Sequence, residues 1–426
     1  MTIPTRTSSR RMAAALIACG ALFLAGCTTS SGAHFQEAGD GQGGRNAGAA
    51  VTSPPADPSS APGTLTVTPA ANSKNVAPNV PITIAATAGA TVTSVTVTAG
   101  SSTIKGTLAA DGKTWTSTTA LKFNTTYTVA VSGTNLANGQ SQTTSTFTTV
   151  KPTKTVSPHL IANALQALKS GATYGVGEPI MVHFAHAIPT SQRAAIVDAL
   201  TVTSTPHVDG RWHWINSQQV DYRGEHYWPV GATVRVSAKL YGVSLGKGVY
   251  GGANAHATIH IGDKHYAVAD NKTHMMKVYI NDKLVKTVPV SMGMGGSTRG
   301  SQGQLINYWT RSGPHVVIVK SPTVTMSSAS YGITDPKSPF FYAPETVHDA
   351  VRISYSGEFV HLRTWTVGDI GKRNTSHGCI NVGAAYASYM YHLLRTGDIV
   401  DVVNTPVKVS FGNTVADWAV PWSQWK

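Results

Sequence analysis

Residues 92–97 read Val92-Thr93-Ser94-Val95-Thr96-Val97, and residues 127–131 read Tyr127-Thr128-Val129-Ala130-Val131. Apolar and polar side chains alternate in both stretches, which is typical of β-strands that bury one face. Similar short runs recur between turn residues such as Asp111-Gly112. This spacing predicts a small antiparallel sandwich over residues 63–150.

The pattern continues in a second strand-rich segment, residues 151–256. Its strands include 180–184 and 233–236, and the Pro189 start signal predicts one short helix over 191–200. Aromatic clusters such as His226-Tyr227-Trp228 can bind sugars or pack against a neighbouring domain. We favour packing, because large aromatic side chains contribute most when they are buried.

A third segment, residues 257–403, combines further strands with one strong helix prediction. Strands are expected at 277–280, 284–288 and 399–403, and a helix from Ala384 to Arg395 that stops at Gly397. Three tryptophans close the chain in a final extension, residues 404–426: Trp418, Trp422 and Trp425. Such a group is expected to dock on a groove between domains. The fold class is therefore mainly β.

Composition and charge narrow the classes of partner. The chain has 426 residues, of which 12% are charged, with a formal net charge of +13. A positive balance suits contact with an anionic surface such as a bacterial envelope. The sequence has no dense Lys/Arg run and no basic stretch interleaved with aromatic residues, so we do not expect nucleic-acid binding.

The N-terminus predicts export. Arg6, Arg10 and Arg11 precede an apolar run, residues 12–24, that is too short for a comfortable transmembrane helix. The run ends in Leu24-Ala25-Gly26-Cys27, which resembles a bacterial lipobox and implies acylation of Cys27 after removal of the signal. The alternative is an ordinary cleaved signal peptide. Either the Sec or the twin-arginine route could serve.

The segments that follow from this interpretation are a lipoprotein signal peptide, residues 1–27, and a flexible tether, residues 28–62. The tether is dominated by Gly, Ser, Ala, Thr and Pro and holds too few large apolar residues to form a core. We expect the mature protein on the outer face of the cytoplasmic membrane, anchored by lipid and extending into the cell wall.

Export leaves one thiol in the mature chain. Cys19 leaves with the signal and Cys27 carries lipid, so Cys379 has no disulfide partner. It lies in Asn374-Thr375-Ser376-His377-Gly378-Cys379-Ile380-Asn381-Val382. A Cys nucleophile needs a base to take its proton, and a nearby helix N-terminus favours the anion. The helix predicted from residue 384 is placed to do this.

Two histidines compete for the role of base: His377 and His361, the latter at the end of Phe359-Val360-His361. Spacing alone does not choose between them. Gly378 allows a sharp turn that directs N–H groups toward a reacting carbonyl. Of three other histidines, His256 and His260 would share one strand face and His265 would lie on the other, with no Cys ligand nearby, so we expect no metal site there.

The block Ser376-His377-Gly378-Cys379-Ile380-Asn381, with His361 eighteen positions before the Cys (379 − 361), resembles the L,D-transpeptidase signature. The resemblance is to the actinobacterial, mycobacterial-type lipoproteins with tandem Ig-like domains, and it extends over Trp365, residues 397–400 and the Trp-rich end. It implies a YkuD-type catalytic domain that follows two Ig-like sandwiches.

The resemblance also assigns roles to residues. His361 becomes the base, oriented by the next backbone carbonyl, where Leu362 replaces the family's frequent Ser. Gly378 and Cys379 supply backbone N–H donors, and His377 is a structural or oxyanion-side residue. The implied substrate-binding positions are Ser376, Asn381, Met326, Trp365 and an aromatic at Tyr342 (or Phe341). Met326 and Trp365 could equally be ordinary core residues.

The implied activity is two-step acyl transfer between peptidoglycan stem peptides through a Cys379 thioester, giving 3→3 cross-links. It requires no cofactor, and carbapenems are implied inhibitors. One alternative is a non-catalytic wall-binding lipoprotein. Another keeps the nucleophile but transfers to water or to a protein amine. A sortase-type enzyme is disfavoured, because no matching Arg motif lies near Cys379.

Overall fold

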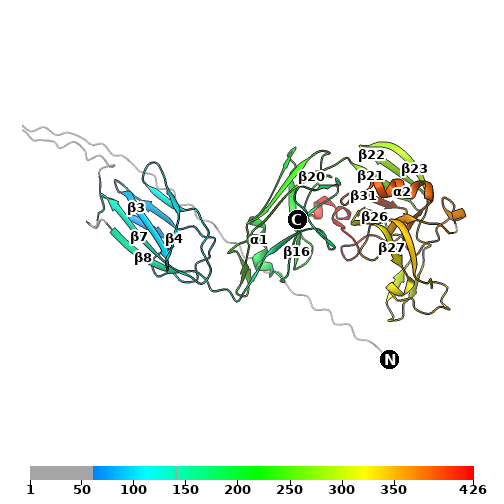
Figure 1. The fold of residues 1–426 in the computed structure, drawn as a ribbon, viewed down its shortest axis with the longest axis horizontal. Helices are drawn as coiled ribbons and strands as arrows, with labels where there is room; N and C mark the ends of the chain where they lie inside the picture. The colour runs from blue at the N-terminus through cyan, green and yellow to red at the C-terminus, as the bar shows by residue number, and fades with distance from the viewer. Residues whose placement is uncertain (1–60, 138, 140–141, 366) are drawn as a thin grey trace, which may run out of the picture. The chain divides into compact units, whose positions relative to one another are not determined.

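A computed structural model describes residues 61–426 except 138, 140, 141 and 366 (Figure 1). The predicted signal peptide, Cys27 and nearly all of the tether lie outside the described residues. Among the described residues, no helix is both long and apolar enough to cross a membrane.

The first sandwich consists of two four-stranded sheets (Figure 1). The strands of one sheet, in spatial order, are β1 (Leu65–Thr68), β2 (Thr83–Ala86), β6 (Thr114–Ser117) and β5 (Gly106–Leu108). Those of the other are β4 (Ser102–Ile104), β3 (Thr91–Ala99), β7 (Thr126–Thr134) and β8 (Gln142–Thr148). Val97, Val129 and Val131 enter the core between them, and Val92 joins them because the register of β3 shifts between Val92 and Ser94.

The second segment forms another set of sheets around its own core. A five-stranded sheet has the order β11 (Gln166–Ala167), β10 (Pro158–Asn163), β13 (Ile180–Phe184), β16 (Gln219–Gly224), β15 (Gly210–Trp214). A four-stranded sheet has the order β12 (Thr173–Tyr174), β20 (Ala255–Ile261), β17 (Thr233–Ala238), β14 (Leu200–Thr205). A small third sheet contains β18 (Ser244–Gly246), β19 (Val249–Gly251) and β9 (Lys154–Val156).

Two predicted limits in this segment shift. Strand β20 continues to Ile261 and pairs with β17, so residues 257–261 belong to the second sandwich and not to the third segment. Helix α1 (Thr190–Asp198) ends before residue 200, because Leu200 already begins β14. The pairing partners of these strands decide both limits, and the local sequence does not reveal them.

The third segment is built on a nine-stranded sheet formed entirely by described residues. Its order is β26 (Gly313–Val316), β31 (Ile399–Val403), β21 (His265–Asp270), β22 (Met275–Ile280), β23 (Lys283–Ser291), β30 (Ile380–Val382), β29 (Phe359–Leu362), β28 (Glu345–Arg352), β27 (Val319–Met326). A separate hairpin pairs β24 (Ser297–Arg299) with β25 (Leu305–Asn307). The sheet brings β29 and β30 together in its interior, where the predicted His and Cys meet.

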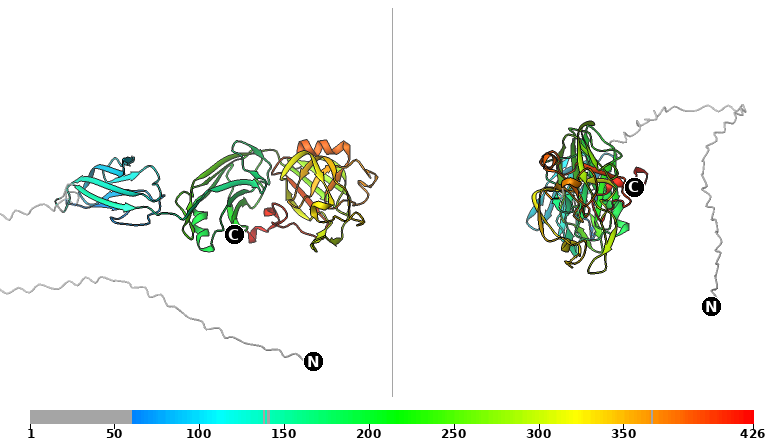
Figure 2. Two further views of the ribbon diagram at one scale, coloured as in Figure 1. Left: turned by 60° about the horizontal axis from the view of Figure 1, so that its bottom comes forward. Right: turned by 90° about the vertical axis from the view of Figure 1, so that its right-hand side faces the viewer.

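Helix α2 (Ala384–Leu393) covers one face of this sheet (Figure 2). Ala387, Met390 and Leu394 enter the same core as Val360 and Val382 of the central strands. The helix ends two residues earlier than predicted, because Leu394 has an extended backbone, with φ −73° and ψ 142°. Gly397 therefore does not cap the helix and instead adopts a positive φ of 91° in the turn that precedes β31.

The C-terminal extension, predicted to dock on a groove between domains, packs on residues of the second and third segments: Val415 and Trp418 share a cluster with Met181 and Ile399. Trp425 is fully buried, and its indole nitrogen donates to the Arg211 carbonyl at 2.9 Å. The Trp418 indole donates to the Gly177 carbonyl at 2.7 Å. The Arg223 guanidinium lies 4.5 Å from the Trp425 ring centroid, a cation–π contact. The extension therefore has a defined place within the fold.

Candidate active site

Cys379 and His361 are brought together by the parallel pair β29 and β30. In this register His361 lies opposite Asn381. Side chains two positions apart along an extended segment share a face, so Cys379 lies on the same face as Asn381. All three line one cavity of about 110 Å³, which we call the narrow cavity. The register thus places His361 on the same side of the sheet as Cys379, which spacing along the chain could not show.

His361 is held as a neutral imidazole. Its side chain is almost fully buried, and its Nδ1 lies 2.8 Å from the Leu362 carbonyl oxygen. A carbonyl only accepts, so Nδ1 carries the proton and Nε2 keeps a lone pair. Burial lowers the pKa of His361 to about 4, so the ring is neutral at physiological pH. The predicted orienting contact with the next backbone carbonyl is present, and the change to Leu362 leaves it intact.

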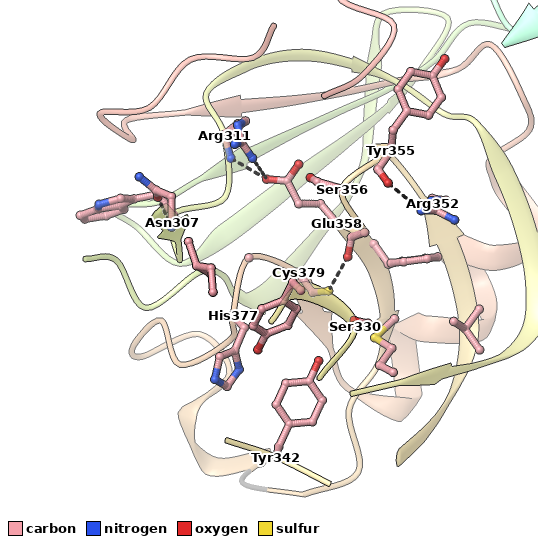
Figure 3. Close-up of a pocket in the computed structure, with 18 of the residues that line it drawn as sticks. Asn307, Arg311, Ser330, Tyr342, Arg352, Tyr355, Ser356, Glu358, His377 and Cys379 are labelled. Carbon is pink, nitrogen blue, oxygen red and sulfur yellow. Dashed lines mark hydrogen bonds and ion pairs between the residues drawn. The ribbon is translucent and has the colours of Figure 1, made fainter. Parts of the chain in front are cut away.

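Cys379 rests as a thiol. Its Sγ donates to the Gly357 carbonyl at 3.6 Å (Figure 3). Burial raises the pKa of the Cys379 thiol to about 12, and the Glu358 and Glu345 carboxylates act in the same direction. The expected help from the helix N-terminus is absent. Strand β30 and Gly383 separate Cys379 from the start of α2, and the effect of a helix dipole fades within one turn.

A second, wider cavity of about 500 Å³ also reaches Cys379, from the side shown in Figure 3. We call it the wide cavity. Met326, Tyr342, His377 and Cys379 line both cavities, whereas His361 lines only the narrow one. The thiol therefore lies where two spaces meet, and the base faces one of them.

The loop before Cys379 is fixed by Ser376. The Ser376 hydroxyl accepts from the Gly378 N–H at 3.1 Å and donates to the Cys379 carbonyl at 2.6 Å. Gly378 has a φ of 131°, a conformation that L side chains rarely adopt, which explains the glycine. This arrangement corrects the prediction for Gly378, because its N–H is engaged by Ser376 instead of being directed at a substrate carbonyl.

The other predicted residues surround the thiol. Met326 packs beside Cys379 in one hydrophobic cluster, and Trp365 lies 37% exposed at the narrow cavity. The His377 ring lies 5.0 Å from that of Tyr342, and within the described part of the chain its Nε2 is buried without a partner. Burial and the nearby Cys379 raise the pKa of Tyr342, so its phenol stays protonated and can donate.

Comparisons with known proteins match both the strand-rich N-terminal part and the part that holds this site. The family model of the L,D-transpeptidase catalytic domain matches residues 264–407, and that of a bacterial Ig domain matches residues 73–244. L,D-transpeptidase 2 of Mycobacterium tuberculosis is 34% identical over 347 residues, which is 81% of this chain and 80% of the relative. The chain belongs to the L,D-transpeptidase family. L,D-transpeptidase 5 of the same species is 31% identical over 368 residues, covering 85% of this chain and 76% of the relative.

The solved structures that are similar to this chain include an L,D-transpeptidase in complex with imipenem. Its sequence is 28% identical to this chain, the match covers 58% of this chain and 99% of the solved one, and the TM-score is 0.45. Within the family fold, this chain's own residues complete the site. The sequence analysis missed several of them because their partners are distant in the sequence.

Glu358 is the first such residue. It follows Gly357, whose carbonyl receives the thiol, and its buried carboxylate lines the wide cavity. Its Oε1 accepts from the Arg311 backbone N–H at 3.0 Å, and its Oε2 accepts from the Asn413 side-chain amide at 3.0 Å. Asn413 belongs to the C-terminal extension, so that extension stabilises the wall of the catalytic site.

Arg363 and Glu345 are the second group that the sequence analysis missed. Both line the narrow cavity together with His361 and Cys379. Arg363 lies two residues after His361, and side chains two positions apart in an extended segment point to the same face of the sheet. Its position could have been noted from sequence, but its proximity to Glu345, which precedes it by 18 positions (363 − 345), depends on the pairing of β28 with β29.

Proposed function

We propose that this L,D-transpeptidase cross-links peptidoglycan stem peptides through a thioester on Cys379, with His361 as the base. The observation that carries the proposal is that both side chains line the narrow cavity from adjacent paired strands. A thiol that attacks a carbonyl must lose its proton, and the neutral Nε2 of His361 is the acceptor in that cavity.

The first half-reaction releases the terminal residue of a tetrapeptide donor. The Cys379 sulfur attacks the carbonyl at the L-centre of the diamino acid as its proton passes to His361. The C–N bond to the D-residue breaks, and His361 returns the proton to the departing amine. Because the pKa of the thiol is raised and that of the imidazole is lowered, this proton transfer accompanies attack and does not precede it.

The second half-reaction transfers the acyl group to an amine of another stem peptide. The amine nitrogen forms the new C–N bond, the C–S bond breaks, and the amine proton passes through His361 to the sulfur. A diamino-acid acceptor gives a 3→3 link. The protonated phenol of Tyr342, beside the thiol, is the donor that we assign to the developing oxyanion.

Intact-protein mass spectrometry after incubation with a carbapenem tests the nucleophile. We expect one adduct of the mass of the intact carbapenem on the wild type, none on Cys379→Ala, and slow formation on His361→Ala. Folding of each variant is checked by circular dichroism. A folded wild type without an adduct would favour a non-catalytic, wall-binding role for the sandwiches.

Product analysis with a disaccharide-tetrapeptide tests the acceptor. Dimers with a 3→3 link support transpeptidation, whereas tripeptide without dimer would identify a carboxypeptidase. A product in which the stem is joined to a protein amine would identify an attachment enzyme.

We further propose that the enzyme is exported and anchored by lipid at Cys27, on the basis of the N-terminal sequence alone. Metabolic labelling with a palmitate analogue and membrane fractionation test this. The wild type should be labelled and sediment with membranes, whereas Cys27→Ala should lose the label. A labelled Cys27→Ala variant would refute the assignment.

A further inference from the structure

Three buried carboxyl groups lie where the C-terminal extension joins the second sandwich. Glu178 lies in the turn before β13, Asp221 lies on β16, and Asp417 begins the short 3₁₀ helix η3 (Asp417–Ala419) of the extension. None of the three side chains is more than 1% exposed. Burying an acid is costly unless it is paired or protonated, so the partners of these groups decide their state.

The three carboxyls have few hydrogen-bond partners. Gln219 donates to both oxygens of Asp221, at 3.0 and 2.9 Å. Among the described residues, both oxygens of Glu178 and Oδ1 of Asp417 are buried without a partner. An unpartnered acid is buried at the smallest cost in its neutral, protonated form.

The surroundings hold these groups in the protonated form. Burial, and then the charge of Asp417, raise the pKa of Glu178 and of Asp221 well above the ordinary values. Burial raises the pKa of Asp417 to about 6, although a hydrogen bond with Asp221 and the Arg223 guanidinium oppose the rise. Arg223 also faces the exposed Glu225. A hydrogen bond between two carboxyl groups requires at least one proton, since ionised carboxylates only accept.

Further titratable groups lie on the elements packed around this junction. They are Tyr174, Tyr227, Tyr355, His265, His315 and Asp398. Burial raises the pKa of the three tyrosines, so their phenols are uncharged at physiological pH. His265 and Asp398 contact each other at 2.9 Å, and His315 donates from Nδ1 to the Gly313 carbonyl at 3.0 Å. The cation that faces Asp417 is therefore Arg223.

The same extension also holds the wall of the wide cavity. The Thr414 hydroxyl donates to the Ile353 carbonyl at 2.8 Å, and the Tyr355 N–H donates to the Asn413 carbonyl at 2.5 Å. The Tyr355 ring points away from Cys379 (Figure 3), and its hydroxyl accepts from the Ala164 N–H of the second sandwich at 3.1 Å. Residues 353–358, which include the carbonyl that receives the thiol, are thus held from the side of the carboxyl junction.

We propose that Glu178, Asp221 and Asp417 make the C-terminal extension an acid-stabilised clasp, which holds the second sandwich and residues 353–358 at acidic pH and loosens as the pH rises. In the released extension the carboxyls meet water and ionise near their ordinary pKa of about 4. Docking is therefore most favourable below about pH 4 and weakens as the pH rises through the docked pKa values, of which that of Asp417 is about 6. This inference goes beyond transpeptidation and does not depend on it.

Hydrogen exchange of the whole protein, followed by mass spectrometry, tests the clasp. Rates are measured from pH 5 to pH 8 and divided by the intrinsic rate of each amide at that pH. The protection of residues 413–425 should fall at least about tenfold, and that of residues 353–360 should fall with it. Strand β7 of the first sandwich should stay within about twofold.

Three results would overturn the inference. The first is constant protection of the extension in the wild type. The second is a fall that leaves residues 353–360 unchanged, which would separate the extension from the wall of the wide cavity. The third is a fall that includes β7, which would indicate global opening instead of release of the clasp.

Neutral amides locate the effect. A variant that combines Glu178→Gln, Asp221→Asn and Asp417→Asn is uncharged at these positions at every pH, and amides match the protonated acids in size. Its protection should therefore stay within about twofold from pH 5 to pH 8. A fall as steep as in the wild type would refute the role of the carboxyls. If the triple variant does not fold, Asp417→Asn alone should show a smaller fall than the wild type, and an equal fall contradicts the proposal.

Asp209→Asn is the matched control. Asp209 is exposed on the second sandwich and pairs with His207 at 3.0 Å, so its substitution removes one carboxylate away from the junction. It should reproduce the fall of the wild type. Loss of the fall in Asp209→Asn would assign the effect to net charge and overturn the clasp.

Discussion

The two cavities that meet at Cys379 are built differently. The wide cavity is walled by the 354–358 turn and by Glu358, whose carboxylate is satisfied by Arg311 and Asn413. The narrow cavity contains His361 and two charged groups, Glu345 and Arg363, that face the space itself. In the first, buried charge stabilises the wall. In the second, Glu345 and Arg363 lie near each other beside His361 and Cys379.

This difference separates structural from chemical effects. A substitution on the wide side should act on stability and on the position of the Gly357 carbonyl. A substitution on the narrow side should act on proton transfer between Cys379 and His361. The following predictions test that division, from the largest expected effect to the smallest.

The largest effect is expected for the base. His361→Gln should slow carbapenem acylation of Cys379 by about 10²- to 10⁴-fold, because general base catalysis is lost. His377→Gln is the comparison. His377 also lines the narrow cavity, but it takes no part in proton transfer in the proposed mechanism. Its effect should be smaller by at least about tenfold. Time-resolved mass spectrometry measures both rates, and equal losses would contradict the assignment of the base.

The pH dependence of thiol reactivity gives the next effect. The pKa of the Cys379 thiol is raised to about 12, so alkylation by iodoacetamide should rise about tenfold per pH unit from pH 7 to 10. A plateau near pH 8 would reveal a preformed thiolate and contradict the neutral pair.

Folding stability should depend on the protonation of His361. Its pKa is lowered from 6.5 to about 4, so below pH 6.5 the unfolded chain binds the proton more tightly than the folded one. The resulting stability is present above pH 6.5 and is lost as the pH falls toward 4, by up to about 3 kcal/mol. Urea unfolding at pH 6.5 and at pH 4 gives the free energy of unfolding at each. The difference between these two free energies should be smaller in His361→Gln than in the wild type. An identical difference would contradict the shift.

Asn413→Ala tests the wall of the wide cavity. The substitution leaves Glu358 Oε2 without its partner at 3.0 Å, and should lower the free energy of unfolding by about 1–3 kcal/mol. Asn404→Gly is the control, because Asn404 binds Asp270 at an exposed position and glycine tolerates its positive φ of 64°. The loss should stay within about 0.5 kcal/mol. Urea unfolding measures both. The carbapenem adduct on Cys379 should still form in Asn413→Ala, and its loss would show that the two cavities are coupled.

The smallest effect is expected for the first sandwich. It has its own apolar core, and its described residues include no buried charged side chain. Deleting residues 64–150 should therefore leave turnover of soluble muropeptides within about twofold of the wild type. Loss of activity in a folded deletion variant would show that the first sandwich contributes to turnover itself and does not serve only as a spacer.

The local sequence pattern predicted many strands and helices of this fold, because the periodicity of a strand or a helix depends on neighbouring residues. Alternating Thr and Val residues predicted β3 and β7, and the apolar run after Gly383 predicted α2. These elements follow from periodicity and from the need to bury one face. The same reasoning misplaced the end of β20, where pairing with β17 extends the strand to Ile261.

The site residues divide in the same way, into those visible in the local sequence and those that depend on contacts between distant segments. A single thiol next to a histidine and a glycine was sufficient to select Cys379, since reactive residue types are visible in the sequence itself. Three features were decided by the tertiary structure: the cavity shared by His361 and Cys379, the engagement of the Gly378 N–H by Ser376, and the proximity of Glu345 to Arg363. Strand register, which depends on contacts between distant segments, sets which side chains share a face and which atoms remain available to a substrate.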